Sequence, residues 1–245
     1  MDYLIAIISF VAAFIFSLGG VGGAIIIIPI LVSFGIPINV AKPVGLFNNI
    51  ISLTGASISN IKNKRLDLKV GIPIIVFSFL SAIAGARISQ YISTDIILIL
   101  FIEFLIFSGM MFLFFKKQET KDDQYKIQYI PLSLIGVIAG LLSGLLGIGG
   151  GVAISPLMMM LGYSPKKTAA ITAFVVPFSS LSAFVVYWSM GAINWKLLLI
   201  VTVAGTIGAQ LGTRFMHNRL NPSQVKKILA FILLGMAFKL ILGIF

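Results

Sequence analysis

Two glycine-rich stretches are the parts of this 245-residue chain whose residue types and spacing suit the binding of a charged solute. Residues 17–24 read SLGGVGGA, and residues 143–151 read SGLLGIGGG. Glycine adopts positive φ angles and lets a ligand approach the backbone closely. A helix that begins after such a break presents N–H groups without intrahelical partners at the positive end of its dipole. We therefore predict an anion site built from backbone amides, with these glycines as its residues: Gly20, Gly22, Gly23, Gly147, Gly149, Gly150 and Gly151.

Close helix packing is the alternative explanation for these glycines. Small residues spaced four apart let helices approach each other, and Gly19 and Gly23 have this spacing, as do Gly140 and Gly144. A packing face explains one glycine in every four residues. It does not explain four glycines within five positions, which occur in both stretches. The pattern favours the anion site.

The composition places these stretches in a membrane. Hydrophobic residues make up 59% of the chain and charged residues only 10%, whereas a soluble domain has roughly 25% charged residues. Residues 3–41 and 127–165 contain no Asp, Glu, Lys or Arg, and about 20 apolar residues are enough to cross a bilayer. We predict an all-α polytopic membrane protein. Its net charge of +11 then reflects basic loops that set orientation, and no nucleic-acid partner is expected.

The chain repeats itself at a constant offset of 127 residues. The offset pairs residues of the two glycine breaks, Pro29 with Pro156, Ser52 with Ser179, and Gly85-Ala86-Arg87 with Gly212-Thr213-Arg214. We predict a first transmembrane repeat over 1–117, a cytoplasmic linker over 118–126 and a second transmembrane repeat over 127–245. A duplication with a purely architectural role is the alternative.

Each half is predicted to contain one interrupted apolar segment followed by three ordinary spans. They are 3–34 with a break at 19–23, 43–61, 70–91 and 96–115, then 127–161 with a break at 147–151, 167–188, 197–216 and 224–244. If each interrupted segment folds back as a helical hairpin or forms two short crossings, the 18 Lys and Arg divide 14 to 4 between the two sides. The positive-inside rule prefers this division. It predicts two inverted-topology repeats, with both termini outside the cell membrane.

Polar side chains in the second span of each half extend the candidate site. Asn48 and Ser52 lie one helical turn apart on the same face, Asn49 is their neighbour, and Ser179 is the repeat partner of Ser52. Amide and hydroxyl donors suit a small oxyanion. Interhelical hydrogen bonding is the other common use of such residues in membranes.

Three charged residues complete the candidate set. Arg87 and Arg214 occupy equivalent places near the end of the third span, where they could attract an anion, gate its pathway or extend to the interface by snorkelling. Glu103 is the one carboxylate inside a predicted span. Because intramembrane ionisable residues are costly and functional by default, we consider it for proton coupling.

The sequence contains few of the residue types that catalyse reactions. There are no cysteines, and the single histidine, His217, is expected in a polar loop, so neither a metal centre nor a nucleophile with a base is predicted. The G-x-x-x-x-G-K-[ST] phosphate loop is absent, which excludes ATP hydrolysis by that route. The chain is therefore predicted to be no enzyme.

The duplicated segments FSLGGVGGAIIIIPIL and SGLLGIGGGVAISPLM resemble those of the TauE/SafE family of sulfite exporter-like membrane permeases. The resemblance covers essentially the whole chain. It implies secondary transport of a small anion, such as sulfite, a sulfonate or a related organic anion, without a cofactor. Inverted repeats suggest alternating access, and a passive anion channel is the competing function. A homodimer is the assembly expected on general grounds.

Overall fold

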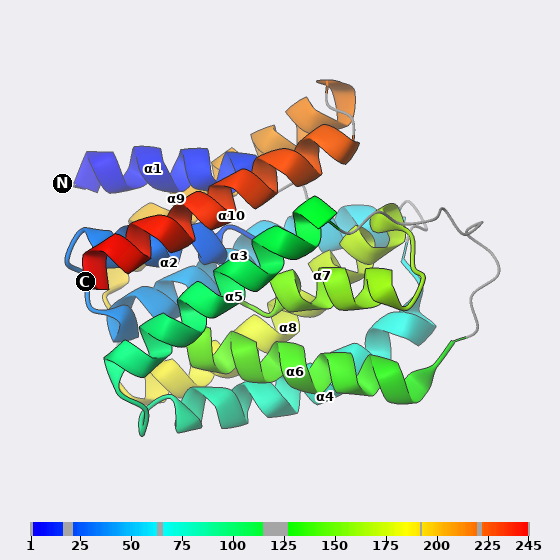
Figure 1. Ribbon diagram of the computed structural model, residues 1–245, viewed down its shortest axis with the longest axis horizontal. Helices are drawn as coiled ribbons and strands as arrows, with labels where there is room; N and C mark the ends of the chain where they lie inside the picture. The colour runs from blue at the N-terminus through cyan, green and yellow to red at the C-terminus, as the bar shows by residue number, and fades with distance from the viewer. Residues whose placement is uncertain are drawn as a thin grey trace.

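The computed structural model describes residues 2–16, 22–62, 66–114, 127–191, 193–219 and 222–244, and within these ranges it is all helical (Figure 1). The ten helices are α1 Asp2–Phe16, α2 Ala24–Ser33, α3 Ile38–Lys62, α4 Leu68–Ile88, α5 Thr94–Phe114, α6 Tyr129–Leu146, α7 Gly151–Met160, α8 Pro165–Ser189, α9 Trp195–Arg219 and α10 Pro222–Ile244.

The predicted spans correspond to these helices, and both glycine breaks separate two helices as expected. Three boundaries differ by three residues or more, and one of them is the end of α4, at Ile88 instead of Tyr91. Helix α3 begins at Ile38 instead of Pro43 and contains Pro43 as an internal proline, which removes one backbone hydrogen bond from its second turn. Helix α9 continues through His217 to Arg219, since no proline or glycine ends it before Pro222. His217 is thus helical rather than in a loop.

Local sequence explains where the helices begin. The side chain of Asp67 accepts the Lys69 amide at 3.1 Å and caps α4. Ser164 caps α8 in the same way, with Pro165 in the first turn. Such residues satisfy amide groups that have no acceptor inside the helix.

The helices run along the long axis of the molecule, and each glycine break reverses the chain. Figure 1 shows α1 running inward from the end of the bundle that holds both termini, and α2 running back toward that end. Helices α6 and α7 form the same kind of hairpin from the opposite end. The two hairpins therefore approach the middle of the bundle from opposite directions.

Each long hairpin helix packs against a helix of the other half of the chain. Helix α6 lies against α4, and α1 lies against α9. A Cβ atom on Gly140 or Gly144 of α6 would overlap the backbone of α4 at Ser78 and Ala82. Close packing, the alternative considered for the glycines, is the role that Gly140 and Gly144 have.

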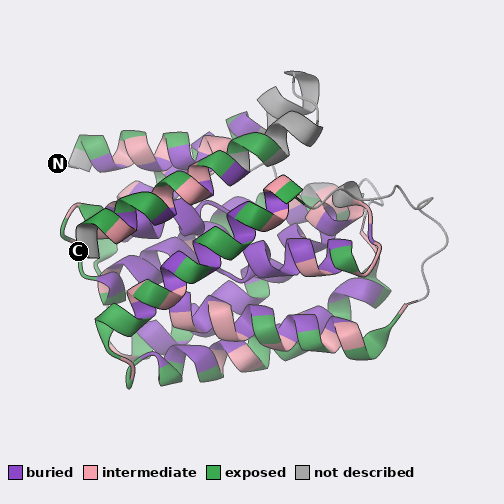
Figure 2. Ribbon diagram, in the orientation of Figure 1, coloured by how far each residue is buried: buried purple, intermediate pink, exposed green. Residues whose placement is uncertain are grey.

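Helices α3 and α8 contact each other. Figure 2 shows buried residues concentrated on these central helices and on the short helices α2 and α7, and exposed residues on the outward faces of α1, α5 and α10. Much of that outward surface consists of large apolar side chains, such as Ile7, Phe107 and Phe231. Such a surface suits contact with lipid rather than water.

Among the described residues, five helical stretches are long and apolar enough to cross a membrane. They are Leu68–Ile88, Thr94–Phe114, Tyr129–Leu146, Lys167–Ser189 and Trp195–Gly212. Shorter apolar helices accompany them, including Tyr3–Ile15, Ala24–Ser33 and Gly151–Met160.

Candidate substrate site

The second glycine break is built from residues with positive φ angles. Gly147 ends α6 with φ +78°, Gly149 follows with φ +78°, and Gly150 precedes α7 with φ +72°. Residues with a Cβ atom rarely adopt this conformation. Gly151 is the first residue of α7 and is buried. These glycines therefore turn the chain within the buried centre.

The first break has the same character where it is described. Gly22 has φ +82°, and Gly23 precedes α2 in a helical conformation. A Cβ atom on Gly22 would overlap the side chain of Asn49. Gly20 lies outside the described residues.

Asn49 of α3 joins the two breaks. Its Oδ1 accepts the backbone N–H of Ala24, the first residue of α2, at 3.2 Å. Its Nδ2 donates to the carbonyl oxygen of Ile148 in the second break at 3.0 Å. The side chain is fully buried. A neutral amide oxygen thus occupies the position at the start of α2 where an anion was predicted. Of the two uses considered for Asn49, the structure shows interhelical hydrogen bonding.

Asn48 differs from its neighbour because neither Oδ1 nor Nδ2 has a hydrogen-bond partner in the described part of the chain. Its side chain is fully buried and lies between the first break and α9. A Cβ atom on Gly23 would lie 3.2 Å from Asn48 Nδ2, and one on Gly205 would overlap Asn48 Oδ1. Buried amides without partners are unusual in proteins, so Asn48 has hydrogen-bonding capacity that the described part of the chain does not use.

Both hydroxyl groups predicted for the site donate to backbone carbonyls. Ser52 donates to the carbonyl of Asn48 at 2.7 Å within α3. Ser179 of α8 donates to the carbonyl of Gly149 at 3.0 Å, so it holds the second break in place. Its neighbour Ser180 is buried, has no partner among the described residues, and lies beside Gly149. The sequence analysis did not single out Ser180.

Two of the predicted charged residues, Arg87 and Glu103, are exposed. Arg87 is exposed in the last turn of α4. Arg214 belongs to α9, and its side chain lies outside the described part. Glu103 is exposed on α5, where its role in proton coupling stays a prediction.

Lys42 is the functional candidate that the sequence did not single out. Its side chain in α3 is completely buried, although lysine is rarely buried. The Nζ atom donates to Ser89 Oγ at 2.9 Å and lies 5.8 Å from the centroid of the Tyr187 ring. The predicted span began at Pro43, so Lys42 lay just outside it. The signal was present as the lysine that ends the uncharged run 3–41.

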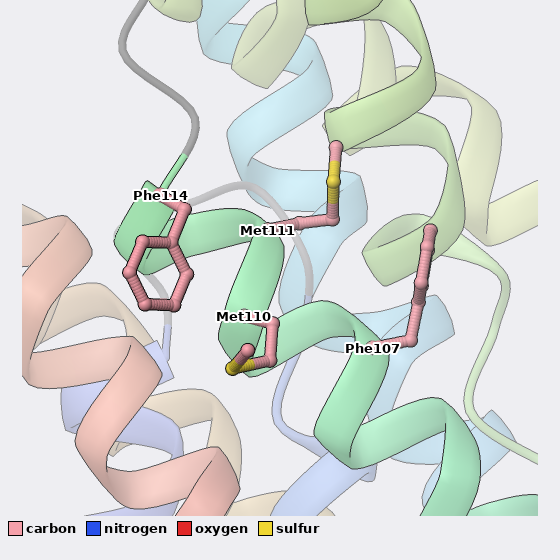
Figure 3. Close-up of a pocket in the computed structure, with 4 residues that line it drawn as sticks. All are labelled: Phe107, Met110, Met111 and Phe114. Carbon is pink, nitrogen blue, oxygen red and sulfur yellow. The ribbon is translucent and has the colours of Figure 1, made fainter.

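A pocket on α5 is unrelated to this polar centre. Figure 3 shows Phe107, Met110, Met111 and Phe114 around it, all of them apolar. In the part of the chain that is described, no group of three His, Cys, Asp or Glu residues is placed to hold a metal ion.

Comparison with known proteins identifies the chain. The family model described as "Sulfite exporter TauE/SafE" matches residues 5–240. The chain is a member of the TauE/SafE family. The resemblance to this family is thus confirmed, and the chain belongs to a family of membrane transporters rather than to an enzyme family.

The relatives of this TauE/SafE protein span bacteria, archaea and plants. It is 32% identical over 251 residues to a probable membrane transporter protein of Methanocaldococcus jannaschii, covering 94% of this chain and 91% of the relative. It is 27% identical to one of Bacillus subtilis, with 98% and 99% covered. A sulfite exporter TauE/SafE family protein of Arabidopsis thaliana is 40% identical over 101 residues, covering 41% of this chain and 20% of that protein. No solved structure matches the chain.

Proposed function

We propose that this TauE/SafE protein is a secondary transporter that exports a small sulfur-containing or organic anion, such as sulfite or a sulfonate. The observation that carries the proposal is the buried polar centre, where both glycine breaks meet the adjacent residues Asn48 and Asn49 of α3. Asn48 has two hydrogen-bonding atoms without described partners, and a small oxyanion is complementary to its amide donor. The family description and the names of the plant relatives agree with this substrate class.

Inverted repeats are part of the proposal, with the first repeat over 1–117, a cytoplasmic linker over 118–126 and the second over 127–245. The arrangement is supported by helix contacts that recur when each helix is replaced by its equivalent in the other half. Helix α4 packs on α6, and their equivalents α9 and α1 also pack together. Helix α3 contacts its own equivalent, α8, and α5 contacts its own equivalent, α10. Equivalent helices of the two halves run in opposite directions in Figure 1. Exchange of conformations between such halves produces alternating access.

The proposed site comprises the glycines of both breaks together with Asn48, Asn49, Ser52 and Ser179. Because Asn49 already accepts the first N–H of α2, the helix start proposed to face the anion is that of α7. The N-terminal N–H groups of α7 face the same break that Asn49 and Ser179 hold. Helix N-termini favour anions through their free N–H groups and the helix dipole. Arg87 and Arg214 are proposed to act at opposite mouths of the pathway.

Proteoliposomes test this function directly. Purified protein is reconstituted, and sulfite flux is followed with and without an imposed proton gradient. A transporter coupled to protons accumulates sulfite against its gradient, whereas a passive channel only equilibrates it. A thermal-shift screen against sulfite, sulfate, thiosulfate, sulfoacetate and carboxylates identifies the ligand, because a ligand that binds only the folded state raises the melting temperature. Failure of every anion to bind or move contradicts the proposal.

A further inference from the structure

Lys42 is buried together with two polar groups from distant parts of the chain. Its amine donates to Ser89 Oγ at 2.9 Å. Ser89 Oγ lies 3.0 Å from Tyr187 Oη, which is 2.7 Å from the carbonyl oxygen of Gly144. A phenol has a single hydrogen, so Tyr187 donates to that carbonyl and accepts from Ser89. The chain of hydrogen bonds fixes the position of the Lys42 amine against the end of α6.

No carboxylate faces this amine among the residues that the structure describes. Asp67 pairs with Lys167 at 3.2 Å, and Asp95 and Glu103 are exposed on α5. Helix α5 packs mainly against α10, with smaller contacts to α7 and α6. A buried charge without a partner is costly, and an ammonium group carries three N–H donors, of which one has a described acceptor. The amine therefore has donors available for an anion, and an anion beside it would favour its charged form.

Lys42 also lies beside the second glycine break. A Cβ atom on Gly147 would come within 2.7 Å of Lys42 Cβ, so the positive φ of Gly147 leaves room for the lysine. Asn49 follows two helical turns later on α3 and faces the next residue of the break, Ile148. Lys42 and Asn49 thus share one face of α3, and that face is turned toward the break.

We infer that Lys42 supplies the positive charge of the substrate site, binding a small oxyanion beside the second glycine break. Ser89 and Tyr187 are positioning residues that hold the amine. This inference rests on the proposed transport of anions and adds the residue that selects for charge. The competing explanation is that Lys42 only ties α3 to the end of α4 and to α8.

Two probes of similar shape separate these explanations: methanesulfonate, which is charged, and dimethyl sulfone, which is neutral. In the unmodified protein we expect methanesulfonate, and not dimethyl sulfone, to raise the melting temperature. Lys42→Met is expected to weaken methanesulfonate binding at least about 30-fold, the usual effect of removing one partner of a buried charge pair. Its melting temperature without ligand should not fall, because an apolar side chain replaces a buried charge. Lys239→Met, at an exposed lysine of α10, is the matched control.

The outcomes are distinct. If the unmodified protein responds to no anion, the proposed function fails. If it responds and Lys42→Met binds methanesulfonate equally well, only the inference about Lys42 is overturned. Ser89→Ala keeps every charge and removes the acceptor of the amine. Ser89→Ala should raise the half-saturating methanesulfonate concentration in flux assays while leaving the maximal rate within about twofold. An unchanged half-saturating concentration overturns the inference. This second test still applies if Lys42→Met does not fold.

Discussion

The side-chain amide of Asn49 lies 3.0 Å from the carbonyl oxygen of Ile148, which is 99 residues further along the chain. The oxygen of the same amide accepts the N–H of Ala24 at 3.2 Å. One side chain of α3 therefore satisfies backbone groups at both glycine breaks. Any motion that separates the breaks has to exchange at least one of these bonds for another partner.

Replacing Asn49 with alanine should destabilise the protein. Asn49→Ala leaves a buried N–H and a buried carbonyl without partners, at a cost of about 1–3 kcal/mol for each. Thermal unfolding in detergent measures the loss. Asn39→Ala is the matched control, since Asn39 is exposed on the same helix and such substitutions change stability by about 0.5 kcal/mol or less. Equal melting temperatures for the two variants would contradict the bridging role.

Replacing Asn48 should have the opposite effect on stability. Asn48→Leu keeps the branched heavy-atom skeleton of the side chain and removes polar atoms that have no described partner. Its melting temperature should stay equal or rise, because no hydrogen bond is lost. The increase in melting temperature caused by the transported anion should shrink or vanish. A marked loss of stability with normal anion binding would show that Asn48 is structural.

Substitution of Gly149 tests the conformation of the second break. Gly149→Ala places a Cβ atom at a positive φ, which costs roughly 1–2 kcal/mol, and within 2.5 Å of Asn49 Nδ2. Gly55→Ala is the control, because Gly55 is helical with open space around it and should gain up to about 1 kcal/mol. We further expect Gly22→Val and Gly149→Val to insert in the membrane but lose sulfite transport. Normal transport by both valine variants would remove the breaks from the site.

Reporter fusions test the orientation. The 14-to-4 division of basic residues predicts that both termini are outside, and both termini lie at one end of the bundle in Figure 1. A reporter that is active only outside the cytoplasm should be active at the carboxyl terminus. The same reporter inserted within 118–126 should be inactive. The reverse pattern contradicts the predicted topology.

The two arginines should act on different sides of the membrane. Arg87→Ala is expected to impair uptake of anion from the outer face, and Arg214→Ala from the inner face, if each attracts anions at one mouth. Flux in both directions through vesicles of known orientation measures this difference. Losses that do not depend on direction would favour a purely structural role for both residues.

The sequence predicted those features that depend on local pattern. The glycine breaks, the hairpin helices and the polar positions of α3 follow from residue type and spacing, and Asn48 and Asn49 were both singled out. Their different roles could not be predicted, because adjacent residues point about 100° apart on a helix and only the packed neighbours show which has partners. The burial of Lys42 depends on Ser89 and Tyr187, which are distant in sequence and give no local signal.

The packing of α6 on α4 and of α1 on α9 has a consequence for biogenesis. When the ribosome has delivered only the helices up to α5, the face of α4 that receives the glycines of α6 still borders lipid, and α1 awaits a helix from near the end of the chain. Maturation is therefore completed only after the last third of the protein has entered the bilayer. A truncated product leaves its early helices without their packing partners, and we expect quality-control proteases to degrade it. Two halves that are expressed together as separate chains should associate and recover activity.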